Sequence, residues 1–242
     1  MIDVHSHILP MVDDGARSHE EALTMLRAAV VQGVTIQVLT PHIHHGKFDN
    51  SQEQLTSEFI KFKSVVNEAS IKIKLLLAAE LHISDTLLDL ALKDEIPIIG
   101  KVNGLKIFLL EFPRIELPLG YDNLVKWLLS KGYLPLIVHP ERNQTFIKQP
   151  QKLEALYNLG CPLQITGSSI LGHFGEEARD FAMKLLENDM VSAIASDCHN
   201  LKGRSPNLGE AWEVVDRVFS HKKLYSTISQ KQELIINENP FL

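Results

Sequence analysis

Apolar runs of strand length alternate with amphipathic stretches of helical length along this chain of 242 residues. The alternation predicts parallel strands joined by helices, because two parallel strands need a crossover connection of about a dozen residues or more. The seven expected strands are Ile2–His5, Thr35–Thr40, Lys74–Ala79, Lys106–Glu111, Leu134–His139, Leu163–Thr166 and Val191–Ser196. The expected helices are Ser18–Gln32, Ser51–Ala69, Asp85–Leu92, Gly120–Lys131, Gln151–Leu159, Glu176–Asn188 and Leu208–Phe219. A chain of this order folds either as a barrel or as an open doubly wound sheet.

Side chains of the kind that bind metals follow nearly every expected strand. His5 and His7 leave the first strand two positions apart, so both can reach one ion as neutral imidazoles. Asp197 and His199 repeat that spacing after the last strand. Taken singly, each such residue could be a solvated strand end or a hydrogen-bonded core residue, but two alternate-residue pairs make coincidence a poor explanation. The candidate metal ligands are His5, His7, Asp14, His42, Glu80, Glu111, His139, Asp197 and His199.

These strand ends decide between the two architectures. Only a closed or nearly closed barrel gathers so many strand ends around one pocket, whereas an open sheet usually binds its ligand at one switch point. The sequence therefore predicts an α/β fold in the form of a distorted, seven-stranded (β/α)7 barrel. Since α/β barrels of this length commonly form one unit, residues 1–242 are expected to be a single domain. The mixed nitrogen and oxygen donors suit manganese, iron or zinc.

The composition limits which kinds of partner the protein can bind and in which cellular compartment we expect it. A formal net charge of −6 and an isoelectric point near 6.0 give no basic surface for nucleic acid. No apolar run approaches the roughly 18 residues of a membrane span, and no secretory signal is visible. Cys161 and Cys198 are too few for a disulfide framework. The sequence thus predicts a cytoplasmic protein with neither nucleic-acid binding nor direct membrane insertion, and leaves a homo-oligomer open.

A competing motif overlaps the last pair of candidate ligands. Cys198 and Arg204 have the C-x5-R spacing of the cysteine phosphatases, in which a thiolate attacks a phosphate held by backbone amides. The segment has one glycine, where a tight phosphate cradle usually needs more. The anionic Asp197 beside the thiol would also raise its pKa, which disfavours the thiolate. The metal interpretation is therefore preferred to the cysteine mechanism.

Other histidines lie close to the candidate ligands in the sequence. His44 and His45 follow the Pro41-His42 turn and could line the pocket, and His82, two residues after Glu80, could support a ligand from behind. The sequence leaves the roles of these three histidines open.

At this point the chain resembles the polymerase-and-histidinol-phosphatase (PHP) superfamily, and within it the bacterial CpsB/CapC-type manganese-dependent protein-tyrosine phosphatases. The resemblance covers nearly the whole length and rests on the motifs quoted next. They are D-V-H-S-H-I-L-P at 3–10, V-D-D-G-A at 12–16, T-P-H at 40–42, A-E at 79–80, L-E-F at 110–112, V-H-P-E-R at 138–142 and I-A-S-D-C-H-N-L-K-G-R-S-P at 194–206. One departure is Thr166-Gly167, where the family pattern leads us to expect an asparagine-containing turn.

The resemblance implies three divalent ions, manganese by preference, with iron or zinc as alternatives. By position, His5, His7, Glu80 and Asp197 would hold the first ion; Glu80, Glu111 and His139 the second; and Asp14, His42 and His199 the third. Arg142 and Arg204 would clamp the phosphate, which suits their forked guanidinium groups. The expected reaction is hydrolysis of phosphotyrosine by a metal-activated hydroxide, with any general acid near Asp14 and His199.

The resemblance also implies a partner. The expected substrate is the tyrosine-rich tail of a membrane-linked bacterial tyrosine kinase that controls capsule or exopolysaccharide synthesis. Three alternatives are a small-molecule phosphatase of the histidinol-phosphatase kind, a metal-dependent amidohydrolase, and a non-enzymatic module bound to a polymerase. Intact ligand positions argue against the last, since a structural barrel has no need for so many converging ligands.

Overall fold

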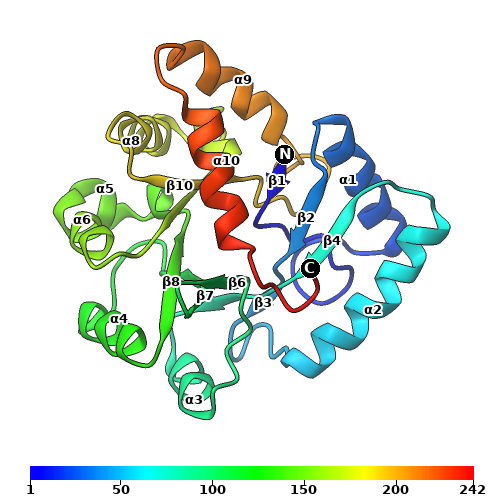
Figure 1. The fold of residues 1–242 in the computed structure, drawn as a ribbon, viewed down its shortest axis with the longest axis horizontal. Helices are drawn as coiled ribbons and strands as arrows, with labels where there is room; N and C mark the ends of the chain where they lie inside the picture. Colours follow the sequence, from blue (N-terminus) through cyan, green and yellow to red (C-terminus); the bar gives the residue numbers. More distant parts are fainter.

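The computed structural model describes residues 1–242 and has an α/β fold with parallel strands at its centre and helices around them (Figure 1). The strands are β1 (Ile2–Asp3), β2 (Ile36–Leu39), β3 (His42–Ile43), β4 (Lys74–Leu77), β5 (Glu80–His82), β6 (Gly100–Val102), β7 (Leu105–Glu111), β8 (Tyr133–Val138), β9 (Leu163–Thr166) and β10 (Val191–Ala195). One sheet has the order β1-β2-β4, and the other has the order β10-β9-β8-β7-β5-β3, with β6 antiparallel to β7.

Each of the predicted helices is present. The helices are α1 (His19–Val31), α2 (Gln52–Glu68), α3 (Asp85–Lys93), α4 (Tyr121–Ser130), α5 (Gln144–Lys148), α6 (Pro150–Asn158), α7 (Gly167–Ile170), α8 (Glu176–Glu187), α9 (Leu208–Val218) and α10 (Leu224–Ile235), with a 3-10 turn at Pro140–Arg142. Ser18 caps the first helix, because its Oγ accepts a hydrogen bond from Glu21 N at 3.1 Å. Helices α5, α7 and α10 were not predicted.

The structure has ten strands where the sequence predicted seven. Two predicted strands, which correspond to β2 and β4, are each followed after a two-residue break by a further short strand, β3 and β5, and these further strands belong to the other sheet. Pro41 lies in the first break, and it lacks the N–H group that a continuous ladder would use. The third additional strand, β6, forms a hairpin with β7 through Asn103 and Gly104, which both have positive φ.

A closed seven-stranded barrel is not established. From β10 to β1 the connection consists of one isolated parallel bridge, Ser6 to Cys198. Two backbone hydrogen bonds flank it, from Asp197 N to His5 O and from His7 N to Cys198 O, both 2.9 Å long. The strands therefore form two hydrogen-bonded sheets and no single uninterrupted barrel ladder.

Alternate strand residues face two different apolar clusters. The inner cluster takes Val38, Leu76, Leu109, Leu136 and Ala193 from the strands and includes the end of α10, whereas the larger outer cluster packs the strands against the helices. Helix α10 crosses the near face of the strands in Figure 1 and contacts β10, β6 and β1. The inner apolar cluster is thus covered by α10 at the start of the strands, which leaves the strand ends available for a site.

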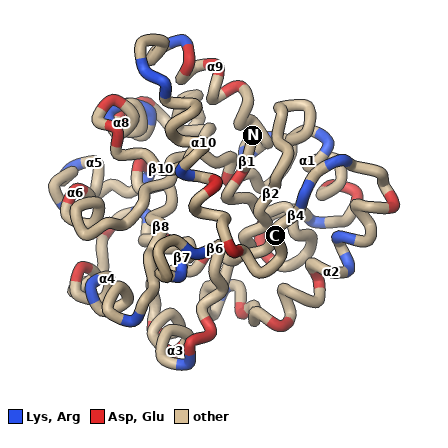
Figure 2. The backbone as a smooth tube through the Cα atoms, viewed as in Figure 1, with Lys and Arg blue, Asp and Glu red and all other residues tan.

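Positions of basic and acidic residues are interspersed along the outer helices (Figure 2). None of the helices combines the length and the apolar character needed to cross a membrane.

Candidate metal centre

The candidate ligands continue the inner face of the strands beyond the apolar cluster. His42 begins β3 and is paired in register with Glu80, which begins β5, and Glu111 ends β7 opposite His82. Asp197 lies two residues after β10, in register with the inner residues Ala193 and Ala195 of that strand. Because side chains two residues apart on a strand share a face, these carboxylates and imidazoles lie on top of an apolar core and point into one space.

Four of the predicted ligands meet at the centre of this space. The Nε2 atoms of His5 and His7 are 3.2 Å apart. Glu80 Oε2 lies 3.3 Å from the first and 3.2 Å from the second. Asp197 Oδ1 lies 3.5 Å and 3.4 Å from the same two atoms. Ligands about 2.1 Å from a tetrahedral ion stand about 3.4 Å apart, so His5, His7 and Glu80 have the separations of a metal site, and Asp197 Oδ1 lies at a matching distance from both rings.

Several buried polar atoms here have no hydrogen-bond partner. They are His42 Nδ1, Glu80 Oε2, Asp197 Oδ1 and His199 Nε2, all on predicted ligands. A buried polar or charged atom without a partner costs on the order of 1–3 kcal/mol or more, and cations bound among these groups would give such atoms a partner. The donor set therefore fits divalent metal ions.

The remaining predicted ligands extend the site in two directions. Asp14 Oδ1 is 3.5 Å from both His42 Nε2 and His199 Nε2, and these residues form one metal-ligand group with His7. His42, Glu80 and Glu111 form a second group. His139 Nε2 is 2.7 Å from Glu80 Oε1. Asp14 is the most exposed predicted ligand at this end, with 44% of its side chain accessible.

Burial shifts the pKa values of His42, His139 and Glu111. Burial lowers the pKa of His42 to about 3 and that of His139 to about 4, so both rings are neutral, which is the form that binds metals. Burial and the neighbouring Glu80 charge raise the pKa of Glu111 to about 8. Carboxylates packed this closely repel one another until a cation neutralises them.

Two residues that the sequence analysis missed orient the ligand histidines. Asp13 Oδ2 is 2.7 Å from His7 Nδ1 and accepts a hydrogen bond from His42 N at 3.0 Å. Gln164 Oε1 is 2.8 Å from His5 Nδ1. A histidine that binds a metal usually donates its other N–H to such a partner. The doubled aspartate at 13–14 and a glutamine in the buried strand β9 were the available signals.

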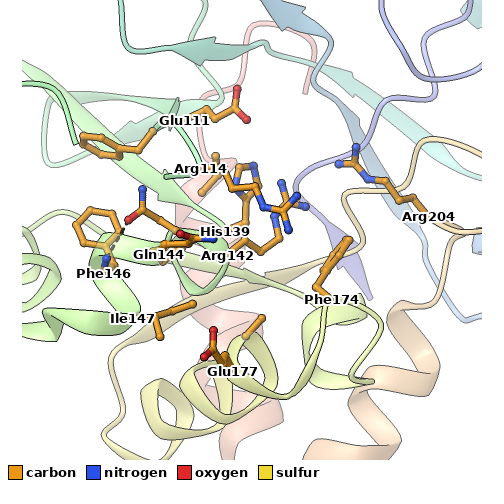
Figure 3. Close-up of a pocket in the computed structure, with 15 residues that line it drawn as sticks. Glu111, Arg114, His139, Arg142, Gln144, Phe146, Ile147, Phe174, Glu177 and Arg204 are labelled. Atoms are coloured by element: carbon orange, nitrogen blue, oxygen red, sulfur yellow. Dashed lines mark hydrogen bonds between the residues drawn. The ribbon is translucent and has the colours of Figure 1, made fainter. Parts of the chain in front are cut away.

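Both arginines of the predicted phosphate clamp contact the same carboxylate oxygen. Arg142 and Arg204 each donate to Asp197 Oδ2 at 2.6 Å. They also line a cavity of about 370 Å³, together with Glu111, His139 and Arg114 and with apolar residues that include Phe112, Phe146 and Phe174. In Figure 3 the three arginines lie around the space between Glu111 and Phe174. The ring of Phe174 packs on Arg142, with its centroid 4.9 Å from the guanidinium carbon.

The structure argues against Cys198 as a nucleophile. Its side chain is fully buried, and burial together with the Asp3 charge raises the pKa of the thiol. The amides that would form a phosphate cradle are already used, because Asn200 Oδ1 accepts hydrogen bonds from the backbone N–H groups of Lys202, Gly203 and Arg204. Cys198 instead lies between Asp197 and His199 and pairs with Ser6.

The structure places His44, His45 and His82, whose roles the sequence left open, in two different environments. The rings of His44 and His82 stack with centroids 4.1 Å apart, and with Glu111 they form a further group of metal-ligand atoms. His45 is 78% exposed and lies 3.0 Å from Asp49. His44 and His82 therefore belong to the neighbourhood of the site, whereas His45 lies at the surface.

Known proteins with similar sequences extend over the whole chain. A family model described as capsular polysaccharide synthesis, CpsB/CapC, matches residues 1–237. Tyrosine-protein phosphatase YwqE of Bacillus subtilis (strain 168) is 33% identical over 242 residues, which cover 100% of this chain and 94% of that protein. Tyrosine-protein phosphatase CpsB of Streptococcus pneumoniae is 30% identical over 232 residues, covering 92% and 93% of the two chains.

Solved structures agree with this similarity. One crystal structure, from a pair of structures of YwqE and CpsB described as unique metal-dependent tyrosine phosphatases, superposes with a TM-score of 0.88 at 32% identity and covers 98% of this chain and 95% of the other. An amidohydrolase from Mycoplasma synoviae superposes with a TM-score of 0.60 at 10% identity, covering 98% and 87%. The second likeness concerns the fold alone.

Proposed function

The chain belongs to the CpsB/CapC family, and we propose on this basis and on the site geometry that it is a metal-dependent tyrosine-protein phosphatase of capsule or exopolysaccharide synthesis. One observation carries the proposal. His5, His7, Glu80 and Asp197 converge at metal-ligand separations directly beside a cavity that holds arginines and aromatic rings. A cation cluster, a phosphate clamp and a wall for an aryl group are the parts that hydrolysis of an aryl phosphate needs.

We propose three divalent ions, with Mn²⁺ preferred over iron or zinc. By the family resemblance, the residues that would hold them are His5, His7, Glu80 and Asp197 for the first, Glu80, Glu111 and His139 for the second, and Asp14, His42 and His199 for the third. In support, His5, His7 and Glu80 form one group of possible ligands, Asp14, His42 and His199 form another with His7, and His139 Nε2 lies 2.7 Å from Glu80 Oε1. Such ions would lower the pKa of water toward neutrality and withdraw charge from the phosphate oxygens.

The arginines bind and orient the phosphate in this proposal. Arg142 and Arg204 use one N–H each on Asp197 Oδ2, so each guanidinium keeps further donors for the cavity. Their planar, forked donors match the oxygens of a phosphate. The contact with Asp197 also fixes the position of both side chains, which reduces the entropy lost when the substrate binds.

The apolar part of the cavity supports an aryl ester as the substrate. Phe174 lies beside Arg142, and Phe112 and Phe146 line the same space. A phosphotyrosine ring would bury apolar area against these side chains, whereas a phosphoserine side chain is too small to do so. Because a phenolate leaves readily, the demand for a general acid is small, and the Asp14–His199 edge is our candidate source of a proton.

Some finer points belong to the same proposal. We expect the substrate to be the phosphorylated tail of a bacterial tyrosine kinase, and the protein to act in the cytoplasm. We also treat residues 1–242 as one domain, in which the Ser6–Cys198 bridge joins the two sheets into a distorted barrel.

The decisive experiment combines metal analysis with a substrate panel. The purified protein is loaded with Mn²⁺, its metal content is measured, and release of phosphate is followed from a phosphotyrosine peptide, the matching phosphoserine peptide and histidinol phosphate. We expect turnover of the phosphotyrosine peptide far above that of the other two. Hydrolysis of histidinol phosphate alone would favour the small-molecule phosphatase, and no phosphate release from any ester by the metal-loaded protein would refute the proposal.

A further inference from the structure

A second row of metal-binding side chains lies one step outward from the proposed ligands. In the register of β3, β5 and β7, His42 pairs with Glu80, Ile43 with Leu81, and His82 with Glu111. His44 and His82 each follow a proposed ligand by two residues, so they continue the same face of their strands. His44, His82 and Glu111 therefore form a row across three neighbouring strand ends, parallel to the row that contains His42 and Glu80.

The contacts within this row are those of a ligand set. One donor atom from each of His44, His82 and Glu111 lies within 4.8 Å of the others. The two imidazole rings stack with an interplanar angle of 12°, and all three residues are partly accessible to solvent. Donors on one ion at about 2.1 Å stand at most about 4.2 Å apart, and an imidazole binds in the plane of its ring, so the His44 and His82 rings must turn out of their stacked arrangement to direct one nitrogen each at a single cation.

We propose that His44, His82 and Glu111 bind a divalent transition-metal ion in addition to the three proposed above. Two imidazoles and one carboxylate suit zinc, nickel or copper and not magnesium or calcium. With only three protein donors and access to solvent, this outer site binds its ion more weakly than the buried centre and leaves coordination positions to water. Glu111 belongs to both sites, which places the outer ion at the mouth of the metal centre.

The neighbouring histidine supplies a matched control. His45 follows His44 in the chain, but its ring is exposed and is paired with Asp49 at 3.0 Å. Removing His45 deletes one imidazole from the same turn without touching the row. His44→Ala/His82→Ala removes two of the three donors and leaves Glu111 in place for its role in the buried centre.

The test counts ions and does not depend on activity. Wild type, His44→Ala/His82→Ala and His45→Ala are loaded with Mn²⁺ and dialysed against a series of free Zn²⁺ concentrations, and bound zinc and manganese are measured by elemental mass spectrometry. We expect wild type and His45→Ala to bind one weak equivalent of zinc per chain that the double variant lacks. Equal zinc numbers in all three proteins would overturn the proposal.

Two further measurements show whether a loss of zinc comes from misfolding and whether the two histidines contact the substrate instead. Circular dichroism and thermal melting show whether the double variant is folded, and the single variant His82→Asn serves if it is not, with the same expected loss. Hydrolysis of the phosphotyrosine peptide is recorded on the same samples. Unchanged zinc numbers would reject the cation site whatever the kinetics show, and a raised KM beside them would assign His44 and His82 to substrate contact.

Discussion

At the scale of single residues, Asp197 contacts both the predicted metal ligands and the two arginines of the predicted phosphate clamp. One of its carboxylate oxygens lies 3.4–3.5 Å from the ring nitrogens of His5 and His7, and the other accepts from Arg142 and Arg204. Although burial opposes it, the charges of these arginines hold the pKa of Asp197 well below its usual range. The same carboxylate thus faces the proposed metal centre on one side and contacts both arginines of the proposed phosphate clamp on the other.

Arg204→Ala should lower turnover of aryl phosphates while leaving the metal content near that of wild type. Loss of one donor to transition-state charge typically costs on the order of 100-fold or more in kcat. Steady-state kinetics together with elemental analysis measure both quantities. Unchanged kinetics would reduce Arg204 to a partner of Asp197 at the edge of the site.

Asp13→Asn should weaken metal binding although Asp13 is not a proposed ligand. Its carboxylate contacts His7 Nδ1 at 2.7 Å and fixes the ring so that Nε2 faces the centre. Loss of such a supporting group typically costs about 10- to 100-fold in metal affinity or activity. The control is Asp49→Asn, whose carboxylate contacts the exposed His45 instead. If a titration with Mn²⁺ gives the same affinity for both variants, Asp13 has only a structural role.

Cys198→Ala should retain most of the activity, within a few-fold of wild type. The thiol is fully buried, so its removal leaves a small cavity and costs about 1 kcal/mol of stability. Kinetics and a thermal melt distinguish that effect from a chemical role. An inactive Cys198→Ala variant that is folded and carries its full metal content would restore the thiolate mechanism.

At the scale of secondary structure, the sequence predicted the positions of helices and strands better than the pairing of the strands into sheets. Apolar runs and helical patterns located seven strands and seven helices, because burial imposes those patterns directly, but they did not locate the 12-residue helix α10. The breaks at Pro41 and after Ala78 depend on which sheet each half pairs with, and pairing across the molecule leaves no local pattern. The β6–β7 hairpin does have a local signal in the sequence, because Asn-Gly is the dipeptide that favours a two-residue hairpin turn.

The same distinction applies to the candidate site. His5, His7, Asp197 and His199 could be recognised because alternate residues at a strand end have a defined geometry. Asp13 and Gln164 act through contacts with residues elsewhere in the fold, so their roles required coordinates. The second row of His44, His82 and Glu111 likewise depends on the register of three strands.

Gly100→Ala tests how β6 and α10 are joined. A Cβ at Gly100 would lie 2.3 Å from Ile235 O and 2.5 Å from Asn237 O, both backbone atoms that cannot rotate away. Overpacking of this kind costs about 1–3 kcal/mol or more. Gly203→Ala is the control, because nothing lies within 4 Å of its added methyl group. Urea denaturation should show a clear loss of stability for the first variant and little change for the second.

At the scale of the whole molecule, stability and function are concentrated at opposite ends of the strands. Ile235 and Ile236 at the end of α10 belong to the apolar cluster inside the strands. Beyond the other end of that cluster lie buried carboxylates and imidazoles whose donor atoms have no hydrogen-bond partners. The apolar end can hold the fold together while the polar end keeps donors that only cations satisfy.

Metal ions should therefore stabilise the whole fold as well as support catalysis. An ion that binds the native state alone adds RT ln(1 + [L]/Kd), about 2.7 kcal/mol at 100 times Kd. For a chain of this size each kcal/mol raises Tm by about 2–4 °C, so saturating Mn²⁺ should raise Tm by on the order of 5–10 °C above the chelated protein. Scanning calorimetry after exhaustive chelation, and again after Mn²⁺ is restored, measures this shift alongside phosphatase activity. The two should rise together with Mn²⁺ concentration, because the same buried donors serve both. Full activity in excess chelator, or activity that returns with no change in Tm, would show that the clustered donors are not the ones the reaction uses.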